Sequence, residues 1–296
     1  MAWISGNDFN NWRVPGDDAL VEAVAKGIQS VDPDQLQTVE INVNTSSSLD
    51  DRTWAPIISL NSTYTYSATY IQMLHSYNQT PVMPAYLVEA HYDLEDVGNP
   101  PDYGTPEVLR REEYWTMLSG GVGQFYGNRY TWSLTPGWES YIDTLGASQL
   151  KIWKDFFSSL PWQVLVPDQE HKVVTAGFGA FGDGEVQFKE SNLTAKIMQR
   201  VSQSDFATAA ATGDGSLEVV YVPTARTITV NMASLKNSSS GRWFDPTNGT
   251  STAIPGGPFA NTGTRQFAPP GNHHGGDSDW ILVLDASGLR GSDSSR

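Results

Sequence analysis

Two carboxylates, Asp8 and Glu89, stand out by their position in the sequence. Asp8 follows a short strand-like segment at residues 3–5, and Glu89 ends a near-continuous apolar run at residues 81–88. Side chains at the carboxyl ends of strands form the active-site face of a (β/α)₈ barrel. Two carboxyl groups there can hydrolyse a glycosidic bond, because one protonates the leaving oxygen while the other attacks the sugar or activates water. The alternative for each is a helix cap or a loop ion pair.

Several neighbours of these carboxylates could contact a sugar. His91 lies two residues after Glu89 and orients that carboxylate, binds the substrate or is a plain loop histidine. Aromatic rings can serve as flat platforms for sugars, but they also fill hydrophobic cores. Packing in the core or at the rim is therefore the alternative for each further candidate. These candidates are Trp12, Tyr126, Asn128, Tyr130 and Trp132.

Two other groups of polar residues have simpler structural interpretations. One group lies on a predicted helix and should form ion pairs along it: Glu107, Arg110, Arg111, Glu112 and Glu113. The other group is close in sequence: His273, His274, Asp277 and Asp279. Its spacing matches no standard metal-ligand set and its surroundings are rich in glycine, so a solvated loop is expected. No metal and no other cofactor is expected.

The composition limits the class of protein. The chain has 296 residues, no cysteine and a formal charge of −15. Nucleic-acid backbones are bound by clustered Lys and Arg, so this charge argues against a nucleic-acid partner, while a neutral sugar is compatible with it. An acidic surface that keeps the protein soluble explains the charge equally well. No apolar run approaches the roughly 20 residues that a membrane span needs, so no membrane partner is expected.

Strand-like and helix-like segments alternate up to about residue 160. This alternation predicts parallel strands joined by crossover helices. Roughly four strand–helix units are half of what a closed barrel needs, although an open doubly wound sheet has the same local pattern. The predicted strands are 3–5, 36–43, 63–66, 82–88 and 123–127, and the predicted helices are 17–28, 67–78, 106–118 and 150–157, with a short helix or turn at 50–60.

The pattern changes after Pro161 to short strands separated by turn residues, which is typical of an antiparallel β-sandwich. Hairpin turns are indicated at Asp214-Gly215 and at Asn248-Gly249. The expected domains are a partial barrel at 1–162, a β-sandwich at 163–286 and a disordered tail at 287–296. The predicted strands are 173–177, 196–201, 217–222, 227–232, 242–244 and 280–284. Alternation along them predicts this core: Val174, Val220, Val222, Ile228, Val230, Trp243, Ile281 and Val283.

Several motifs, in this order, resemble the apiosidase-like glycoside hydrolases and the collagen-binding-like β domain that follows them. The first part carries the motifs at residues 3–8, 36–40, 84–92 and 110–128, and the second part carries those at residues 242–246 and 279–284. The resemblance implies strands 4 to 8 of a (β/α)₈ barrel, with earlier strands missing from this sequence. It also implies that Asp8 is the acid/base and Glu89 the nucleophile of a retaining mechanism, and that Asn7 bonds the sugar 2-hydroxyl.

The leading hypothesis is therefore a secreted glycoside hydrolase that acts on a polysaccharide. The chain contains Asn-x-Ser/Thr sequons, which are compatible with secretion but arise easily in a Ser/Thr-rich sequence. One rival hypothesis is a carbohydrate-binding, collagen-binding or structural protein with an inactive remnant of a barrel. Another is a scaffold without a site. The sequons are Asn44, Asn61, Asn78, Asn192, Asn237 and Asn248.

Overall fold

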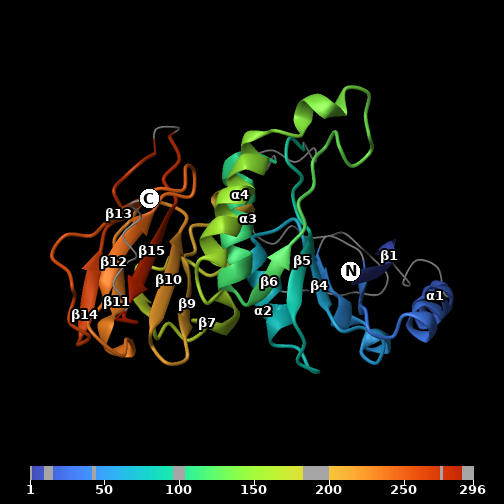
Figure 1. Ribbon diagram of the computed structural model, residues 1–296, viewed down its shortest axis with the longest axis horizontal. Coiled ribbons are helices and arrows are strands. Elements are labelled where there is room, and N and C mark those ends of the chain that lie inside the picture. Colours follow the sequence, from blue (N-terminus) through green and yellow to red (C-terminus); the bar gives the residue numbers. More distant parts are fainter. Residues whose placement is uncertain are drawn as a thin grey trace. The chain divides into compact units, whose positions relative to one another are not determined.

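The structure is a computed structural model that describes residues 2–9, 16–41, 45–95, 104–182, 200–273 and 276–288. Contacts along the chain divide it into two compact units (Figure 1). The first unit comprises Met1–Ser148 and Phe181–Ser204, and the second comprises Gln149–Ala180 and Asp205–Arg296. Within the described ranges, no helix is both long and apolar enough to span a membrane.

The first unit alternates strands with helices, as the sequence predicts. Its strands are β1 (Ala2–Phe9), β2 (Leu36–Ile41), β3 (Thr45–Ser47), β4 (Asn61–Thr65), β5 (Ala85–Glu89) and β6 (Gly121–Gln124). Its helices are α1 (Asp17–Val31), α2 (Thr69–Tyr77), α3 (Pro106–Leu118) and the first residues of α4 (Leu145–Ser158), with 3₁₀ turns at Ser48–Asp50, Arg52–Trp54, Trp138–Tyr141 and Val201–Gln203. The predicted strand at 196–201 is wrong where the structure describes it, because Val201 begins a 3₁₀ turn there.

The strands of the first unit pair mainly in parallel. β1 pairs with β2, and β4, β5 and β6 follow one another in a second sheet whose edge strand β3 is antiparallel. The parallel pairs confirm the prediction of crossover helices, since parallel neighbours need a long connection. The carboxyl ends of β4 and β5 therefore lie at the same edge of their sheet.

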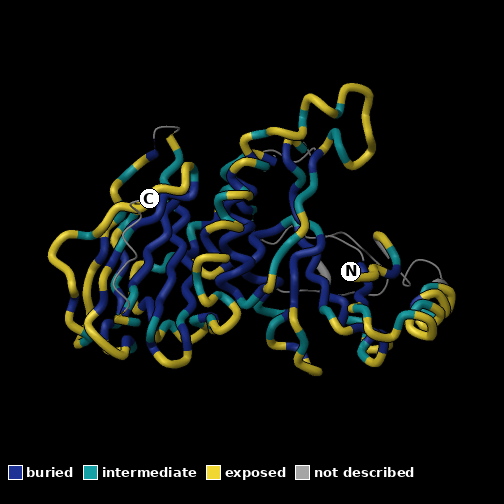
Figure 2. Tube along the Cα trace, viewed as in Figure 1, coloured by how far each residue is buried: buried dark blue, intermediate teal, exposed yellow. Residues whose placement is uncertain are grey.

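Strand β5 is covered on both faces, which explains its continuous apolar sequence. Leu87 packs in a cluster with Met73 of α2, whereas Tyr86 and Val88 pack with Tyr64 of β4. Figure 2 shows the resulting buried backbone through this sheet and an exposed α1. Thr105 caps α3 by accepting a hydrogen bond from the Val108 amide, and the helix is buried from Val108 to Leu118.

The second unit consists of antiparallel sheets. A six-stranded sheet has the order β13-β12-β15-β10-β9-β7, and a three-stranded sheet has the order β14-β11-β8. The strands are β7 (Leu165–Pro167), β8 (Val174–Ala176), β9 (Thr208–Thr212), β10 (Leu217–Val222), β11 (Ile228–Asn231), β12 (Ser240–Phe244), β13 (Ser251–Ala253), β14 (Thr264–Phe267) and β15 (Trp280–Asp285). The unit also holds the rest of α4 and the 3₁₀ turns Trp162–Val164 and Met232–Ser234.

One hydrophobic cluster draws residues from both of these sheets, including Val220 of β10 and Ile228 of β11. Six of the eight predicted core residues belong to it. The other two, Ile281 and Val283, are also fully buried but lie outside this cluster, to which Leu282 and Leu284 of the same strand belong. Because β15 is buried on both faces, alternation alone does not tell which face meets the other sheet.

Both predicted hairpin turns are confirmed. Asp214-Gly215 connects β9 to β10, and Asn248-Gly249 connects β12 to β13. Gly215 has φ 68°, and a Cβ there would lie 2.5 Å from the Ser234 carbonyl oxygen, so only glycine fits this turn. In this unit, the sequence missed four short strands, β7, β9, β13 and β14. Of the predicted tail at 287–296, residues 289–296 lie outside the described residues.

Candidate active site

Glu89 lies at the carboxyl end of β5, where two tyrosines of the neighbouring strand reach it. The Tyr64 hydroxyl donates to Glu89 Oε1 at 2.9 Å, and the Tyr66 hydroxyl donates to the same oxygen at 3.0 Å. The parallel register places Tyr64 directly beside Glu89, and Tyr66 follows β4 by one residue. Two donors on one carboxylate oxygen fix the orientation of the group.

The phenols around Glu89 remain protonated donors. Burial raises the pKa of Tyr66 far above its usual value, and the charge of Glu89 raises it further. Burial and the same charge also raise the pKa of Tyr92, which lies three residues after Glu89. A phenol that keeps its proton at every physiological pH can hold a carboxylate through a catalytic cycle without itself transferring the proton.

His91 is buried behind this group. Its Nδ1 lies 2.5 Å from Glu112 Oε1, and both side chains are almost completely inaccessible to solvent. Its ring meets that of Tyr66 edge-on, with the ring centroids 5.1 Å apart. His91 thus contacts Tyr66 and Glu112, and its predicted direct action on Glu89 or on substrate stays a prediction.

Two acidic residues that the sequence interpretation missed lie close to the same phenols. Glu40 is buried in β2. Burial raises the pKa of Tyr92 most, the charge of Glu89 raises it further, and the charge of Glu40 makes a smaller contribution in the same direction. Glu95 accepts a hydrogen bond from the Tyr92 amide at 2.9 Å, and burial raises the pKa of its carboxyl. An acidic residue inside the predicted strand 36–43 was the signal available for Glu40.

The structure describes only some of the remaining predicted site residues. Asp8 lies in β1, but its side chain is outside the described residues, so its distance from Glu89 stays a prediction. Asn7 is exposed in the same strand. Trp12 lies outside the described residues. Trp132 exposes 69% of its surface, in the long connection that follows β6.

The start of that connection is tied to the loop after β5. The Tyr126 hydroxyl donates to Asp93 Oδ2 at 2.6 Å and bonds Thr144 Oγ1 at 3.0 Å. Burial, followed by the hydrogen bond to Asp93, raises the pKa of Tyr126 to about 12. Asn128 is buried, and its Oδ1 accepts from the backbone amides of Tyr130 and Thr131. These bonds hold the backbone of the connection, and the predicted sugar contacts of Tyr126 and Asn128 stay predictions.

Comparison with known families shows to which family the chain belongs. Residues 1–164 match the model of the apiosidase-like catalytic domain. The chain belongs to the apiosidase-like family. Residues 195–285 match a second model, described as the collagen-binding domain of a collagenase. A comparison with curated proteins gives no match.

Solved structures support the fold of this apiosidase-like chain. A protein described as a glycoside hydrolase is 20% identical, with a TM-score of 0.75, and the match covers 98% of this chain and 65% of that one. A family 5 glycoside hydrolase from Bacteroides vulgatus is 17% identical, with a TM-score of 0.77, covering 100% of this chain and 64% of that one. The chain thus spans slightly less than two thirds of these two structures, and its mixed α/β fold with antiparallel sheets resembles theirs.

The second unit of the apiosidase-like chain corrects one sequence prediction. His273 is not in a solvated loop: its Nδ1 lies 3.1 Å from Asp245 Oδ2, and its Nε2 lies 2.5 Å from the backbone oxygen of Asp279. Its ring also packs on Trp280, with centroids 4.4 Å apart. His274 lies outside the described residues. The described residues contain no group of three or more His, Asp or Glu side chains that could hold a metal ion.

Helix α3 of the apiosidase-like domain contains the predicted ion pair. Arg111 Nη2 lies 2.7 Å from Glu107 Oε1, and Arg111 Nη1 donates to the backbone oxygens of Val201 and Ser204. Arg111 therefore joins α3 to the segment 200–204 of the same unit. Glu112, which the sequence interpretation assigned to the same ion-pair set, contacts His91.

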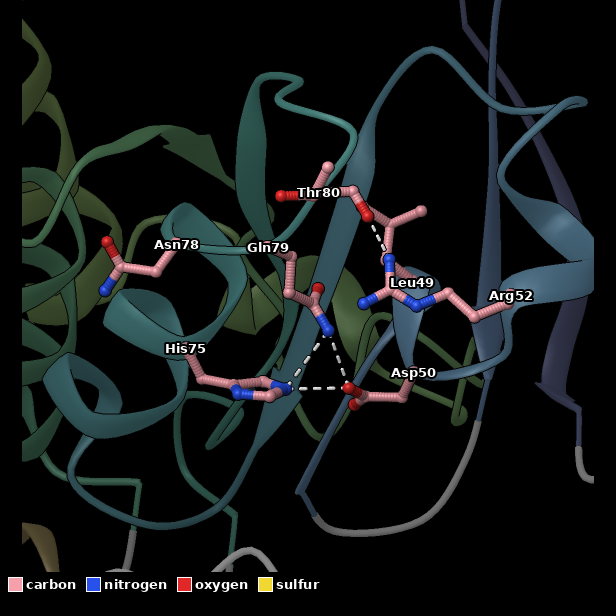
Figure 3. A pocket seen from close by; sticks show the side chains of 7 residues that line it. All are labelled: Leu49, Asp50, Arg52, His75, Asn78, Gln79 and Thr80. Atoms are coloured by element: carbon pink, nitrogen blue, oxygen red, sulfur yellow. Dashed lines mark hydrogen bonds and ion pairs between the residues drawn. The ribbon is translucent and has the colours of Figure 1, made fainter.

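A separate pocket of about 510 Å³ lies near the carboxyl end of α2 (Figure 3). His75 Nε2 and Gln79 Nε2 both lie 2.7 Å from Asp50 Oδ1, and the Ser47 amide donates to Asp50 Oδ2. Gln79 Oε1 in turn accepts from Asn61, the first residue of β4. These side chains therefore bond one another and the first residue of β4. Their bonds stabilise the amino-terminal end of the strand, which is opposite to the end beside Glu89.

Proposed function

We propose that the chain is part of an enzyme that hydrolyses glycosidic bonds of a polysaccharide, with Glu89 as nucleophile. The observation that carries this proposal is the position of Glu89 at a strand end, held by the hydroxyls of Tyr64 and Tyr66. Membership of the apiosidase-like family supports the reaction class. Because the family model is named after apiosidases, polysaccharides with apiose side chains are the first substrates to test.

The proposed mechanism retains configuration at the sugar. Asp8 protonates the leaving oxygen while a carboxylate oxygen of Glu89 attacks the anomeric carbon, which gives a covalent glycosyl-enzyme. Asp8 then takes a proton from water as that water attacks the same carbon and releases Glu89. This mechanism requires the two carboxyl groups to be about 5 to 5.5 Å apart. Asn7 hydrogen-bonds the sugar 2-hydroxyl.

The proposed architecture follows the same resemblance. β1, β2, β4, β5 and β6 correspond to strands 4 to 8 of a (β/α)₈ barrel in residues 1–162, and residues 163–286 form a β-sandwich domain. In support, three parallel pairs join these five strands within the two sheets, and a shared core joins the two sheets of the second unit. The proposed parent protein is secreted, and its substrate is a poly- or oligosaccharide.

Substitution of the nucleophile tests the proposal. Glu89→Gln keeps the shape of the side chain, so it should abolish turnover of an apiose-bearing polysaccharide and leave the thermal unfolding temperature nearly unchanged. The stereochemistry of the first product, followed by NMR, should show retention. Inversion of the anomeric centre, or full activity of Glu89→Gln, would contradict the assignment. Glu107→Gln changes the acidic partner of Arg111 on α3, so it is a matched control that should stay active.

The match of residues 195–285 to a collagen-binding domain supports a second candidate function, in which the β domain binds a polymer and the first unit is an inactive remnant. The two candidates are distinguished by one comparison. If the chain binds collagen or polysaccharide and Glu89→Gln changes neither binding nor any turnover, the binding function alone remains.

A further inference from the structure

Glu112 is a buried acidic side chain on helix α3, whereas the proposed reacting groups are on strands. Only 3% of its side chain is exposed, and its Oε1 lies 2.5 Å from Nδ1 of the equally buried His91. Removing a carboxylate from water is unfavourable unless it is paired and hydrogen-bonded. The close contact with His91 supplies such a partner and holds the imidazole by one ring nitrogen.

The imidazole of His91 in turn limits the movement of Tyr66. The two rings meet edge-on at an interplanar angle of 81°. The imidazole of His91 cannot rotate about the Cβ–Cγ bond without withdrawing Nδ1 from Glu112. The ring that Tyr66 contacts therefore stays in place. Tyr66 donates to Glu89 Oε1, the oxygen that Tyr64 also holds. A continuous series of contacts therefore runs from Glu112 to Glu89.

We propose that Glu112 is a positioning residue for Glu89 and acts through His91 and Tyr66. Its carboxylate fixes the imidazole, the imidazole fixes the phenol, and the phenol fixes the plane of the Glu89 carboxylate. This role rests on the proposed function of Glu89 as nucleophile. A misplacement of about 1 Å can slow an enzyme by roughly a hundredfold, so contacts that fix the orientation of the Glu89 carboxylate affect the rate.

The charges that face His91 come from two elements. Glu112 approaches it from α3, and Glu95 faces it from the loop that follows β5, where burial raises the pKa of the Glu95 carboxyl and the interaction with His91 partly opposes that rise. Tyr66 adds a neutral ring. Loss of the Glu112 carboxylate therefore leaves the His91 ring less firmly fixed, and Glu95 is then the remaining acidic group of these two that faces it.

Carbodiimide labelling of Glu89 in the whole chain tests the proposal without a substrate. A carboxylate oxygen attacks the central carbon of the protonated reagent, and a carboxylate that loses a hydrogen-bond donor is a more reactive nucleophile. Tyr66→Phe should therefore speed labelling of Glu89 at pH 6 by about tenfold, as expected for a hydrogen bond to a charged group. Glu112→Gln should speed it about threefold. The double variant should label no faster than Tyr66→Phe alone, because both changes act on the same contact.

Two further variants separate positioning from general stability. Glu107→Gln breaks the ion pair with Arg111 on the same helix and should leave labelling unchanged. Glu112→Asp keeps the charge and should restore most of the slow labelling. If Glu112→Gln does not fold, as judged by circular dichroism, His91→Gln replaces it, since it removes the ring between Glu112 and Tyr66.

The proposal is overturned if the folded variant labels at the wild-type rate, or if its effect multiplies in full with that of Tyr66→Phe. The proposed function is measured separately, by polysaccharide turnover of the same chain and its Glu89→Gln variant. Non-additive labelling without turnover would support the positioning contacts and count against the nucleophile. Turnover with additive labelling would do the reverse.

Discussion

A carboxyl group is buried inside the sheet of the second unit, at Glu218 in β10. The residue has no exposed surface, and the Ser234 hydroxyl donates to its Oε1 at 2.5 Å. Among the described residues, Oε2 has no hydrogen-bond partner. Burial raises the pKa of Glu218 to about 7; the bond from Ser234 lowers it, and the charge of Asp168 raises it. The folded protein therefore carries Glu218 in its neutral form in mild acid.

This pKa links the stability of the second unit to pH. In the unfolded chain the carboxyl titrates near its ordinary pKa of 4.5, whereas in the folded chain it titrates near 7. Between these values the folded state holds a proton that the unfolded state releases, so the free energy of unfolding falls as pH rises from 4.5 to 7. At 1.36 kcal/mol for each pH unit, the loss amounts to about 3 kcal/mol. It is absent below pH 4.5 and complete above pH 7.

Glu218→Gln removes the ionisation and nearly preserves the shape, so its stability relative to wild type should increase by about 3 kcal/mol between pH 4.5 and pH 8. Hydrogen exchange of the β10 and β15 amides, corrected for the intrinsic rate at each pH, measures this for the second unit alone. Glu170→Gln, at a surface position, is the control and should follow wild type. Parallel pH profiles for Glu218→Gln and wild type would refute the reasoning.

Three further predictions concern other parts of the chain. Burial opposes the charge of His273, but hydrogen bonds to Asp245 and to the Asp279 backbone outweigh it and raise the pKa of His273. In wild type this contribution to stability is present below pH 6.5 and disappears as pH rises through the raised pKa. His273→Gln should lack the contribution, which urea unfolding at pH 6 and pH 9 measures. Asp50→Asn should lower the stability of the first unit by about 1 to 2 kcal/mol, because the bonds from His75 and Gln79 lose their charge; calorimetry measures this. The chain should bind a hydrophobic dye and self-associate in sedimentation, since apolar side chains on β1, α1 and the start of β2 are exposed; a dye-free monomer would contradict this. These side chains are Trp3, Ile4, Leu20, Val24, Val31 and Leu36.

Several elements of the fold were predictable because their signals are local. The bounds of α3 match the predicted 106–118, since Pro106 and the cap Thr105 mark its start and a turn containing Gly120 follows its end. The bounds of β10 match the predicted 217–222, which follow a hairpin turn that requires glycine. Backbone preferences within a few residues decide such features, so a single sequence contains them.

Strand β9 shows where local signals fail. Its sequence is Thr-Ala-Ala-Ala-Thr, and alanine has little preference for strands. It is a strand because β10 and β7 pair with it on either side. A neighbour that supplies hydrogen bonds outweighs the intrinsic preference of the residues, and the neighbour is not visible in the segment itself.

The candidate site divides in the same way. The sequence by itself determined that Glu89 ends a strand buried on both faces, because an apolar run followed by an acid is a local pattern. It did not determine the partners: Tyr64 and Tyr66 reach Glu89 from β4 and the residue after it, and His91 meets Glu112 of α3. The same is true of His273, which the glycine-rich sequence placed in solvent and the fold placed between two aspartates. Strand register and helix packing decide which side chains meet, and both depend on contacts between residues far apart in the chain.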